Sequence, residues 1–373
     1  AVRPQRGAAA ARRARPARGG GGVSAARLAY GIGLPPAAPA TELLELASEV
    51  ERLGYAYLWV NDERLERDPF TLLAAIAQRT GRIRLGPGVT NPYSRHPALV
   101  ASAIATLDEL SGGRAVLGLG AGGTNHRALG VERRAPAAAL REAVELIRGL
   151  WAGGTVTLEG RVVRACEARL DFAPERPRVP IHLGARGPRV LELAGAVADG
   201  VIVGNVATRE GWSYALARIA AGAARAGRSL EQVSLTAWLY ACVADDEEEA
   251  LDAIRPMAAT SLVTSRPVLA ELGIEMPPGF GALMAARGWS LAPEVVAGAG
   301  RVLPPSVVRR FGIAGTPQAC REQLRELLEA FPQISQVAIV PFAPPGGAVV
   351  DTVRRFIEEV VRGPVLQAAA RGS

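Results

Sequence analysis

Few side chains in this sequence are suited to acid–base chemistry at a strand end. The strand-like residues 56–60 are followed directly by Asn61-Asp62-Glu63, which places two carboxylates at one position in the fold. Neighbouring residues of an extended segment point in different directions, so Asp62 and Glu63 do not form the facing pair that a glycosidase requires. We predict that Glu63 donates or accepts a proton; the alternative is an ion-paired residue at the rim of the site.

The three histidines, His96, His126 and His182, are the next candidates. No two of them have the spacing of metal ligands, so we predict no metal site. His96 precedes a proline at a predicted helix start and is expected to cap or to pack. His126 either reaches the edge of a ligand or lies on a surface loop. His182 lies in an apolar strand and either points inward or is a hydrogen-bonded core residue.

Two residue types exclude further classes of chemistry. All 43 basic residues are Arg, which rules out Schiff-base lysines, pyridoxal-phosphate lysines and the phosphate-loop lysine of common NTPases. The cysteines, Cys166, Cys242 and Cys320, are far apart and form no Cys-x-x-Cys pair. This usage is typical of a reducing compartment, so we expect a cytoplasmic protein without disulfide bonds.

Glycine-rich turns follow two of the predicted strands, GLGAGG at 118–123 and GARGP at 184–188. Residues without side chains let backbone amides approach an anion or a planar ring. Pro188 suits the first turn of a helix, which places 184–187 at a helix N-terminus, where the free amides and the helix dipole favour a phosphate. The alternative is that both segments are only tight turns.

The net charge of +7 comes from one end of the chain. Seven Arg and no acidic residue precede residue 28, so the remaining residues carry no net charge. A body without a basic face is not expected to bind nucleic acid. Residues 1–27 are rich in Arg, Ala and Gly and are predicted to be a disordered tail, which leaves open a solvated extension, a targeting segment or a polyanion-binding arm. No apolar run of ~20 residues predicts a membrane span.

Strand-like and helix-like segments alternate eight times from residue 28 onward. The predicted strands are 28–33, 56–60, 83–89, 114–120, 179–185, 199–204, 234–244 and 336–342, and the predicted helices are 40–53, 69–80, 96–111, 136–151, 188–197, 209–226, 317–330 and 349–362. Eight such units favour a parallel (β/α)₈ barrel, formed by 28–373 as one domain. The alternative is an open, doubly wound sheet.

Two segments interrupt this alternation. Residues 155–172 alternate apolar and polar side chains around Glu159-Gly160, which predicts a β-hairpin outside the repeat. Residues 245–312 are predicted to be an irregular insertion after the seventh strand. In a barrel such an enlarged connection either carries substrate specificity and acts as a lid, or covers the side of the barrel.

Five motifs give the chain a specific resemblance. They are GYAYLWVND (54–62), RIRLGPGVTNPYSRHP (82–97), ASAIATLDELSGGRAVLGLGAG (101–122), PIHLGARGPRVLELAGAVADGVIV (180–203) and IAGTPQACREQL (313–324). In this order they resemble the luciferase-like flavin and deazaflavin oxidoreductases. The sequence is most similar to the branch of methylenetetrahydromethanopterin reductases, which use the deazaflavin coenzyme F420. The family fold is a (β/α)₈ barrel with insertions.

The resemblance implies positions for the coenzyme. A non-proline cis peptide at Gly88-Val89, continued by Thr90 and Asn91, would support the deazaflavin ring. Its phosphate would lie against two loops. The implied phosphate-loop residues are Gly120, Gly122 and Asn125 in the first loop, and Gly184, Ala185, Arg186, Gly187 and Pro188 in the second. The resemblance also implies a homodimer formed through helices near the second and third strands.

The chain departs from the family at three acid–base positions. Glu63 stands where many relatives have His, and Gly33 and Gly123 stand where the reductases have acidic residues. The sugar-phosphate dehydrogenase branch holds its substrate with Lys, which this chain lacks. We therefore expect a hydride transfer between F420 and a small organic substrate, with Glu63 as the catalytic residue. The alternatives are an FMN-dependent monooxygenase of the same family and a non-catalytic flavin- or deazaflavin-binding protein.

Overall fold

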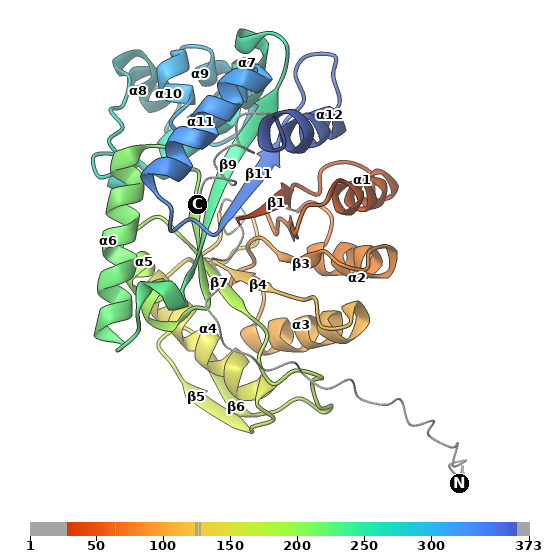
Figure 1. The fold of residues 1–373 in the computed structure, drawn as a ribbon. Helices are drawn as coiled ribbons and strands as arrows, with labels where there is room; N and C mark the ends of the chain where they lie inside the picture. The colour runs from red at the N-terminus through yellow and green to blue at the C-terminus, as the bar shows by residue number, and fades with distance from the viewer. Residues whose placement is uncertain (1–27, 64, 124–125, 127, 364–373) are drawn as a thin grey trace.

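The computed structural model describes residues 28–363 except 64, 124, 125 and 127, so the predicted tail 1–27 lies outside the described residues. Eight parallel strands form a barrel with helices around it (Figure 1). The strands are β1 (Ala29–Leu34), β2 (Tyr57–Val60), β3 (Arg84–Pro87), β4 (Leu117–Leu119), β7 (Ile181–Ala185), β8 (Gly200–Gly204), β9 (Ser234–Val243) and β11 (Gln336–Pro341).

The barrel closes between β3 and β4. The other neighbours follow the order β3-β2-β1-β11-β9-β8-β7-β4. Across the seam, Val116 N donates to Leu85 O at 3.0 Å and Gly120 N donates to Thr90 O at 2.8 Å. An open sheet would leave these edge groups unpaired, so the alternative of a doubly wound sheet is wrong and the predicted (β/α)₈ barrel is confirmed.

The helices alternate with the barrel strands as predicted. They are α1 (Ala40–Leu53), α2 (Pro69–Arg79), α3 (Pro97–Ser111), α4 (Pro136–Trp151), α5 (Pro188–Val197), α6 (Arg209–Arg225), α11 (Pro317–Ala330) and α12 (Val349–Arg355), which continues as a π-helical turn over Phe356–Val361. Local signals set many of these ends. Gly54 ends α1 in the left-handed conformation, and the side chains of Asp68 and Thr316 cap the first turns of α2 and α11.

Two tryptophans fill the inside of the barrel. Trp59 of β2 and Trp238 of β9 are buried, and glycines of the non-adjacent strands β4 and β1 leave room for their rings. A Cβ placed on Gly33 would overlap the Trp238 ring, and one placed on Gly118 would lie 3.3 Å from Trp59 Cζ3. The large side chains on two strands are therefore accommodated by glycines on two others, which keeps the inside of the barrel closely packed.

The predicted hairpin is confirmed as the antiparallel strands β5 (Val156–Glu159) and β6 (Arg164–Ala168). Its turn is fixed by one carboxylate of α4. Glu142 accepts the backbone N–H groups of Arg161, Val162 and Val163 at 2.8–2.9 Å. The hairpin therefore packs against the outside of the barrel as an appendage of α4.

The prediction of an irregular 245–312 is wrong in its first part. This segment begins with the 18-residue helix α7 (Glu247–Thr264), and continues with a 3₁₀ turn (Arg266–Val268), α8 (Pro278–Ala285), α9 (Pro293–Gly300) and α10 (Pro305–Val308). Asp246 caps α7 and three glutamates occupy its first turn, and both features favour a helix here despite Pro256 inside it. A further strand, β10 (Gly312–Gly315), pairs with the end of β9 and was not predicted.

Within the described ranges, no helix has both the length and the apolar character needed to cross a membrane.

Candidate functional site

The predicted site residues lie at the carboxyl ends of the barrel strands. Their centre is the segment after β3, where the Gly88–Val89 peptide bond is cis, as the resemblance implied. Gly88 rests on the two tryptophans: a Cβ there would lie 2.6 Å from Trp59 Cβ and 3.0 Å from Trp238 Cη2. The two buried tryptophans inside the barrel thus support this turn.

Val89 joins the turn to both glycine-rich loops. A Cβ on Gly120 would lie 2.6 Å from Val89 Cγ2, and one on Gly184 would lie 3.0 Å from Val89 Cγ1. The side chain of Val89 therefore sits between the ends of β4 and β7. Gly120 and Gly184 thus make room for the Val89 side chain. The sequence predicted them only as part of a phosphate-binding site and did not include this role.

Thr90 and Asn91 are buried and held by polar contacts. Thr90 Oγ1 donates to Asp62 Oδ2 at 2.7 Å, and Arg95 Nε donates to the same oxygen at 2.9 Å. Asn91 Oδ1 accepts the backbone N–H groups of Tyr93 and Ser94 at 3.0 and 2.9 Å. Asp62 is thus a positioning residue for the turn.

Arg95 extends this network to the start of α2. Its Nη2 donates to Asp68 Oδ2 at 2.6 Å, and its guanidinium lies over the ring of Phe70, 4.9 Å from the centroid. Sequence reasoning missed Arg95. Its place within GPGVTNPYSRHP is the signal that indicates it.

Glu63 is exposed and leans toward the loop after β4. A Cβ on Gly123 would lie 2.5 Å from Glu63 Oε1. The carboxyl group therefore takes up the space that a side chain at position 123 would enter. At Gly33, the other position without an acid, the ring of Trp238 fills the space.

His126 is only 7% exposed, so the surface interpretation of it is wrong. Its ring packs edge-on against Tyr93, with centroids 5.4 Å apart, and a Cβ on Gly122 would lie 2.6 Å from its Nε2. Gly122 needs to be glycine for a second reason, because its φ is 73°. The predicted residue Asn125 lies outside the described residues.

Three polar atoms around the mouth of the barrel are buried and have no hydrogen-bond partner among the described residues. They are Asn61 Oδ1 after β2, His126 Nε2 after β4 and Asn205 Oδ1 after β8. Asn205 is also in the left-handed region, with φ 53°, and its N–H donates to Trp238 O at 2.6 Å. Buried polar atoms are costly without partners, so together they favour a polar ligand here. Sequence reasoning missed Asn205; a polar residue directly after Gly204 at a strand end is the signal.

The other two histidines have structural roles. His96 caps α3: its Nδ1 accepts from Ala98 N at 3.2 Å, and its Nε2 lies 2.9 Å from Arg164 O, which confirms the capping prediction. His182 is buried inside the barrel, 5.4 Å from Trp59 between ring centroids. Burial lowers the pKa of His182 to about 4, so this ring is neutral at pH 7.

The loop after β7 leads into α5. Gly187 is its N-cap and Pro188 its first residue, and apart from its chain neighbours no described residue lies within 4 Å of a Cβ placed on Gly187. Ala185 is the buried end of β7. Arg186 turns its side chain away to α7, where Nη1 donates to Ser265 Oγ at 2.6 Å. The loop thus combines an open helix N-terminus with a cation.

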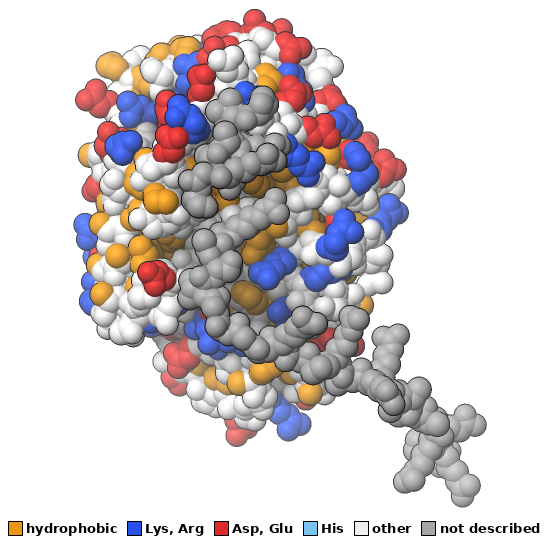
Figure 2. Space-filling model, in the orientation of Figure 1, with side chains coloured by type: hydrophobic (Ala, Val, Ile, Leu, Met, Phe, Trp, Pro, Cys, Tyr) orange, Lys and Arg blue, Asp and Glu red, His pale blue; other side chains and the backbone are white. Residues whose placement is uncertain are grey.

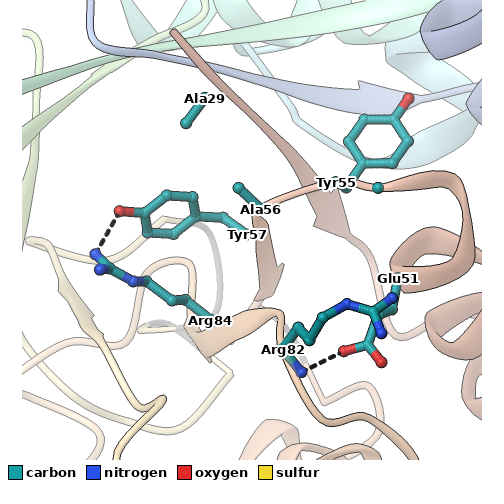
Figure 3. A pocket seen from close by; sticks show the side chains of 8 residues that line it. Ala29, Glu51, Tyr55, Ala56, Tyr57, Arg82 and Arg84 are labelled. Atoms are coloured by element: carbon teal, nitrogen blue, oxygen red, sulfur yellow. Dashed lines mark hydrogen bonds between the residues drawn. The ribbon is translucent and has the colours of Figure 1, made fainter. Parts of the chain in front are cut away.

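A surface pocket of about 450 Å³ lies at the opposite end of the barrel (Figure 3). Four of its polar side chains are hydrogen-bonded within the protein itself. Arg84 Nη1 donates to Tyr57 OH at 2.9 Å, Tyr55 OH donates to Val353 O at 2.8 Å, and Glu51 accepts the N–H groups of residues 81–83. This end of a barrel usually contributes to stability, so the strand carboxyl ends are the candidate site.

Comparisons with known proteins agree with this geometry. Residues 16–333 match the family described as luciferase-like monooxygenase. The chain is 36% identical over 307 residues to 5,10-methylenetetrahydromethanopterin reductase of Methanolobus tindarius, covering 81% of this chain and 91% of that protein. It is 34% identical over 264 residues to F420-dependent glucose-6-phosphate dehydrogenase of Beutenbergia cavernae, covering 67% and 78%.

A solved structure supports the same assignment. The coenzyme F420-dependent tetrahydromethanopterin reductase of Methanopyrus kandleri superposes with a TM-score of 0.79 at 30% identity, over 90% of this chain and 99% of that one. The barrel and the sequence match of 16–333 together lead to one conclusion. The chain belongs to the luciferase-like monooxygenase family.

Proposed function

We propose that the protein is an F420-dependent oxidoreductase that transfers a hydride between the coenzyme and a small organic substrate. The observation that carries the proposal is the turn Gly88–Asn91, supported below by Trp59 and Trp238 and tied by Val89 to both glycine-rich loops. Relatives at 34–36% identity with F420-dependent or methylenetetrahydromethanopterin-reducing activity in their names support the choice of coenzyme.

The residues around the mouth fit such a coenzyme. The unpartnered atoms of Asn61, His126 and Asn205 are suited to the polar edges of a deazaflavin ring. Apart from the chain neighbours, no described residue comes within 4 Å of a Cβ placed on Gly187 or Gly204, which leaves room for a ligand there. When bound, F420 carries the hydride at its deazaflavin ring.

The chain's own residues would bind the coenzyme and orient it. The turn Gly88–Asn91 would support the ring, and Asp62 would hold that turn through Thr90 and Arg95. The amides at the start of α5 would hold the coenzyme phosphate, because a helix N-terminus carries a partial positive charge. The loop residues Gly120 and Gly122 would approach it from the other side.

Glu63 would exchange the proton that accompanies hydride transfer. It is exposed at the mouth, and its carboxyl lies over Gly123 at the end of the loop after β4. A carboxyl group beside the reacting atoms can donate or accept a proton, and such help is worth ~10²–10⁴-fold in rate.

The test is a titration of the purified protein with F420 and separately with FMN, followed by intrinsic tryptophan fluorescence. Trp59 and Trp238 lie directly under the proposed ring site and will report its occupation. We expect F420 to bind more tightly than FMN. Equal or tighter binding of FMN would favour the FMN-dependent monooxygenase instead.

We also propose a homodimer through α2 and α3 in the cytoplasm. Leu99 and Leu110 of α3 and Leu65 before α2 are 69%, 46% and 75% exposed, which gives this region apolar surface for a partner. Sedimentation equilibrium of the purified protein tests the dimer.

On the face seen in Figure 2, acidic and basic side chains both occur, which supports the expectation that nucleic acid is not a partner.

A further inference from the structure

Arg186 has neutral hydrogen-bond partners. Its Nη1 donates to Ser265 Oγ at 2.6 Å and its Nη2 donates to Thr264 Oγ1 at 3.3 Å. Among residues 28–363 that the structure describes, no carboxylate oxygen lies within 4.0 Å of this guanidinium. Its positive charge is hydrogen-bonded but not balanced by a contact.

Other partly buried arginines are satisfied in one of two ways. Arg114 donates all five of its N–H groups to neutral oxygens, whereas two further arginines have carboxylate partners. Arg95 contacts Asp62 and Asp68, and Arg176 contacts Asp108 at 2.5 Å. Removing a charge from water without a counter-charge is unfavourable. Accordingly, burial lowers the pKa of Arg186, and Tyr240 and Glu63 nearby raise it only in part. An anion bound at Arg186 would supply the missing charge.

Helix α7 fixes where this cation lies. Ser265 holds Arg186 directly after the last residue of α7, and Ser261, one turn earlier, lies 3.1 Å from the hydroxyl of Tyr240 on β9. Residues four apart share one side of a helix, so both serines face the barrel. The C-terminal end of α7 therefore fixes the position of the Arg186 side chain.

We propose that the Arg186 side chain binds an anionic group of the substrate, so that the substrate is a small organic acid or a phosphate ester. This inference rests on the proposed function. The loop backbone at 184–187 and the start of α5 would serve the coenzyme phosphate, whereas the guanidinium is held by Thr264 and Ser265 and interacts electrostatically with Glu63 and Tyr240. Its planar donors match carboxylate and phosphate oxygens in pairs.

The experiment measures anion binding to coenzyme-saturated protein by calorimetry, with succinate and inorganic phosphate as probes. Wild-type protein is expected to bind at least one probe without loss of F420. Arg186→Gln is expected to weaken this binding about 10- to 100-fold, as for one lost charged hydrogen-bonded contact. Arg186→Lys is expected to fall between the two, because it keeps the charge but not the planar donors.

Two further variants separate position from charge. Arg189→Gln, at the exposed second residue of α5, is the matched control and should leave probe binding unchanged. Ser265→Ala should weaken probe binding less than Arg186→Gln, because the charge stays and only its anchor is lost. Melting temperatures verify that each variant is folded.

Three results would overturn the assignment. One is equal probe binding by wild type and Arg186→Gln, including no binding by either. The second is competition between the probes and F420. The third is an Arg186→Gln variant that loses affinity for F420 but not for the phosphate-free deazaflavin riboside, which would place Arg186 on the coenzyme phosphate. Failure of wild type to bind F420 at all would instead reject the proposed function.

Discussion

At the residue scale, Asp62 and Glu63 show how adjacent carboxylates take different roles. Their opposite directions were predictable from the extended backbone. Which of them faces the turn was not, because it depends on Thr90 and Arg95, which are 28 and 33 residues away in the chain. The acid–base assignment of Glu63 stays a prediction.

Replacing Glu63 with Gln is expected to slow hydride transfer ~10²–10⁴-fold and to change the Kd of F420 less than twofold. Gln keeps the size and the hydrogen bonding of Glu but does not exchange a proton. The measurement is single-turnover oxidation of reduced F420 with a panel of unsaturated ketones, imines and nitro compounds. A wild-type rate on a substrate whose chemistry limits turnover would make Glu63 a rim residue.

Replacing Asp62 with Asn is expected to loosen the turn after β3. The variant loses charged hydrogen bonds to Thr90 and Arg95, which should lower the free energy of unfolding by about 1–3 kcal/mol and weaken F420 binding. Urea denaturation and the fluorescence titration measure the two effects. In a double-mutant cycle with Arg95→Gln the losses should not add; additive losses would mean that the Asp62–Arg95 contact contributes nothing.

At the scale of elements, the helices were the most predictable part. Apolar spacing and capping residues gave the observed bounds of α1 and α5, with helix α7 as the main failure. Pro256 and the Pro- and Gly-rich segments that follow argued against the 18-residue helix that the structure has. Packing of buried residues such as Leu251 and Ile254 stabilises this helix. Propensity alone does not contain that packing.

The glycines at the strand ends were the least predictable feature of the site. From sequence, Gly120 and Gly184 suggested room for a ligand. In the fold, both accommodate Val89, a contact between distant segments that no local pattern reports. A glycine's sequence position shows that space is needed, but not which group occupies it.

Substituting Ala for Gly120 should therefore displace Val89 and weaken F420 binding. The added Cβ would lie 2.6 Å from Val89 Cγ2, well inside contact distance. Adding Val89→Ala should restore part of the affinity, because it removes the methyl groups in the way. Gly298→Ala, with no atom within 4 Å, is the control for folding. Unchanged coenzyme affinity in Gly120→Ala would contradict this role of Val89.

At the scale of the whole molecule, His182 should make stability depend on pH. Its pKa is about 4 in the folded barrel, against an ordinary value of 6.5, so the unfolded chain binds the proton more readily. The stability contributed by neutral His182 is full above pH 6.5 and is lost as the pH falls toward 4. Between pH 7.5 and 5.0 the loss is expected to be about 2 kcal/mol.

Urea denaturation of wild type and His182→Gln over this range measures the effect. Gln carries no charge at either pH, so the variant should lack this part of the pH dependence while retaining that of the carboxylates. Parallel profiles for the two proteins would show that the imidazole is not responsible.

The match between tryptophan rings and glycines inside the barrel also limits how the sequence can change over evolution. Position 33 cannot gain an acidic side chain while the Trp238 ring occupies its space, whereas at position 123 the near group is only the end of the flexible, exposed Glu63 side chain, which can move aside. The residues of such a pair, as at positions 33 and 238, are therefore expected to change together during evolution. Among relatives, a side chain at the position of Gly33 should be accompanied by a residue smaller than Trp at that of Trp238.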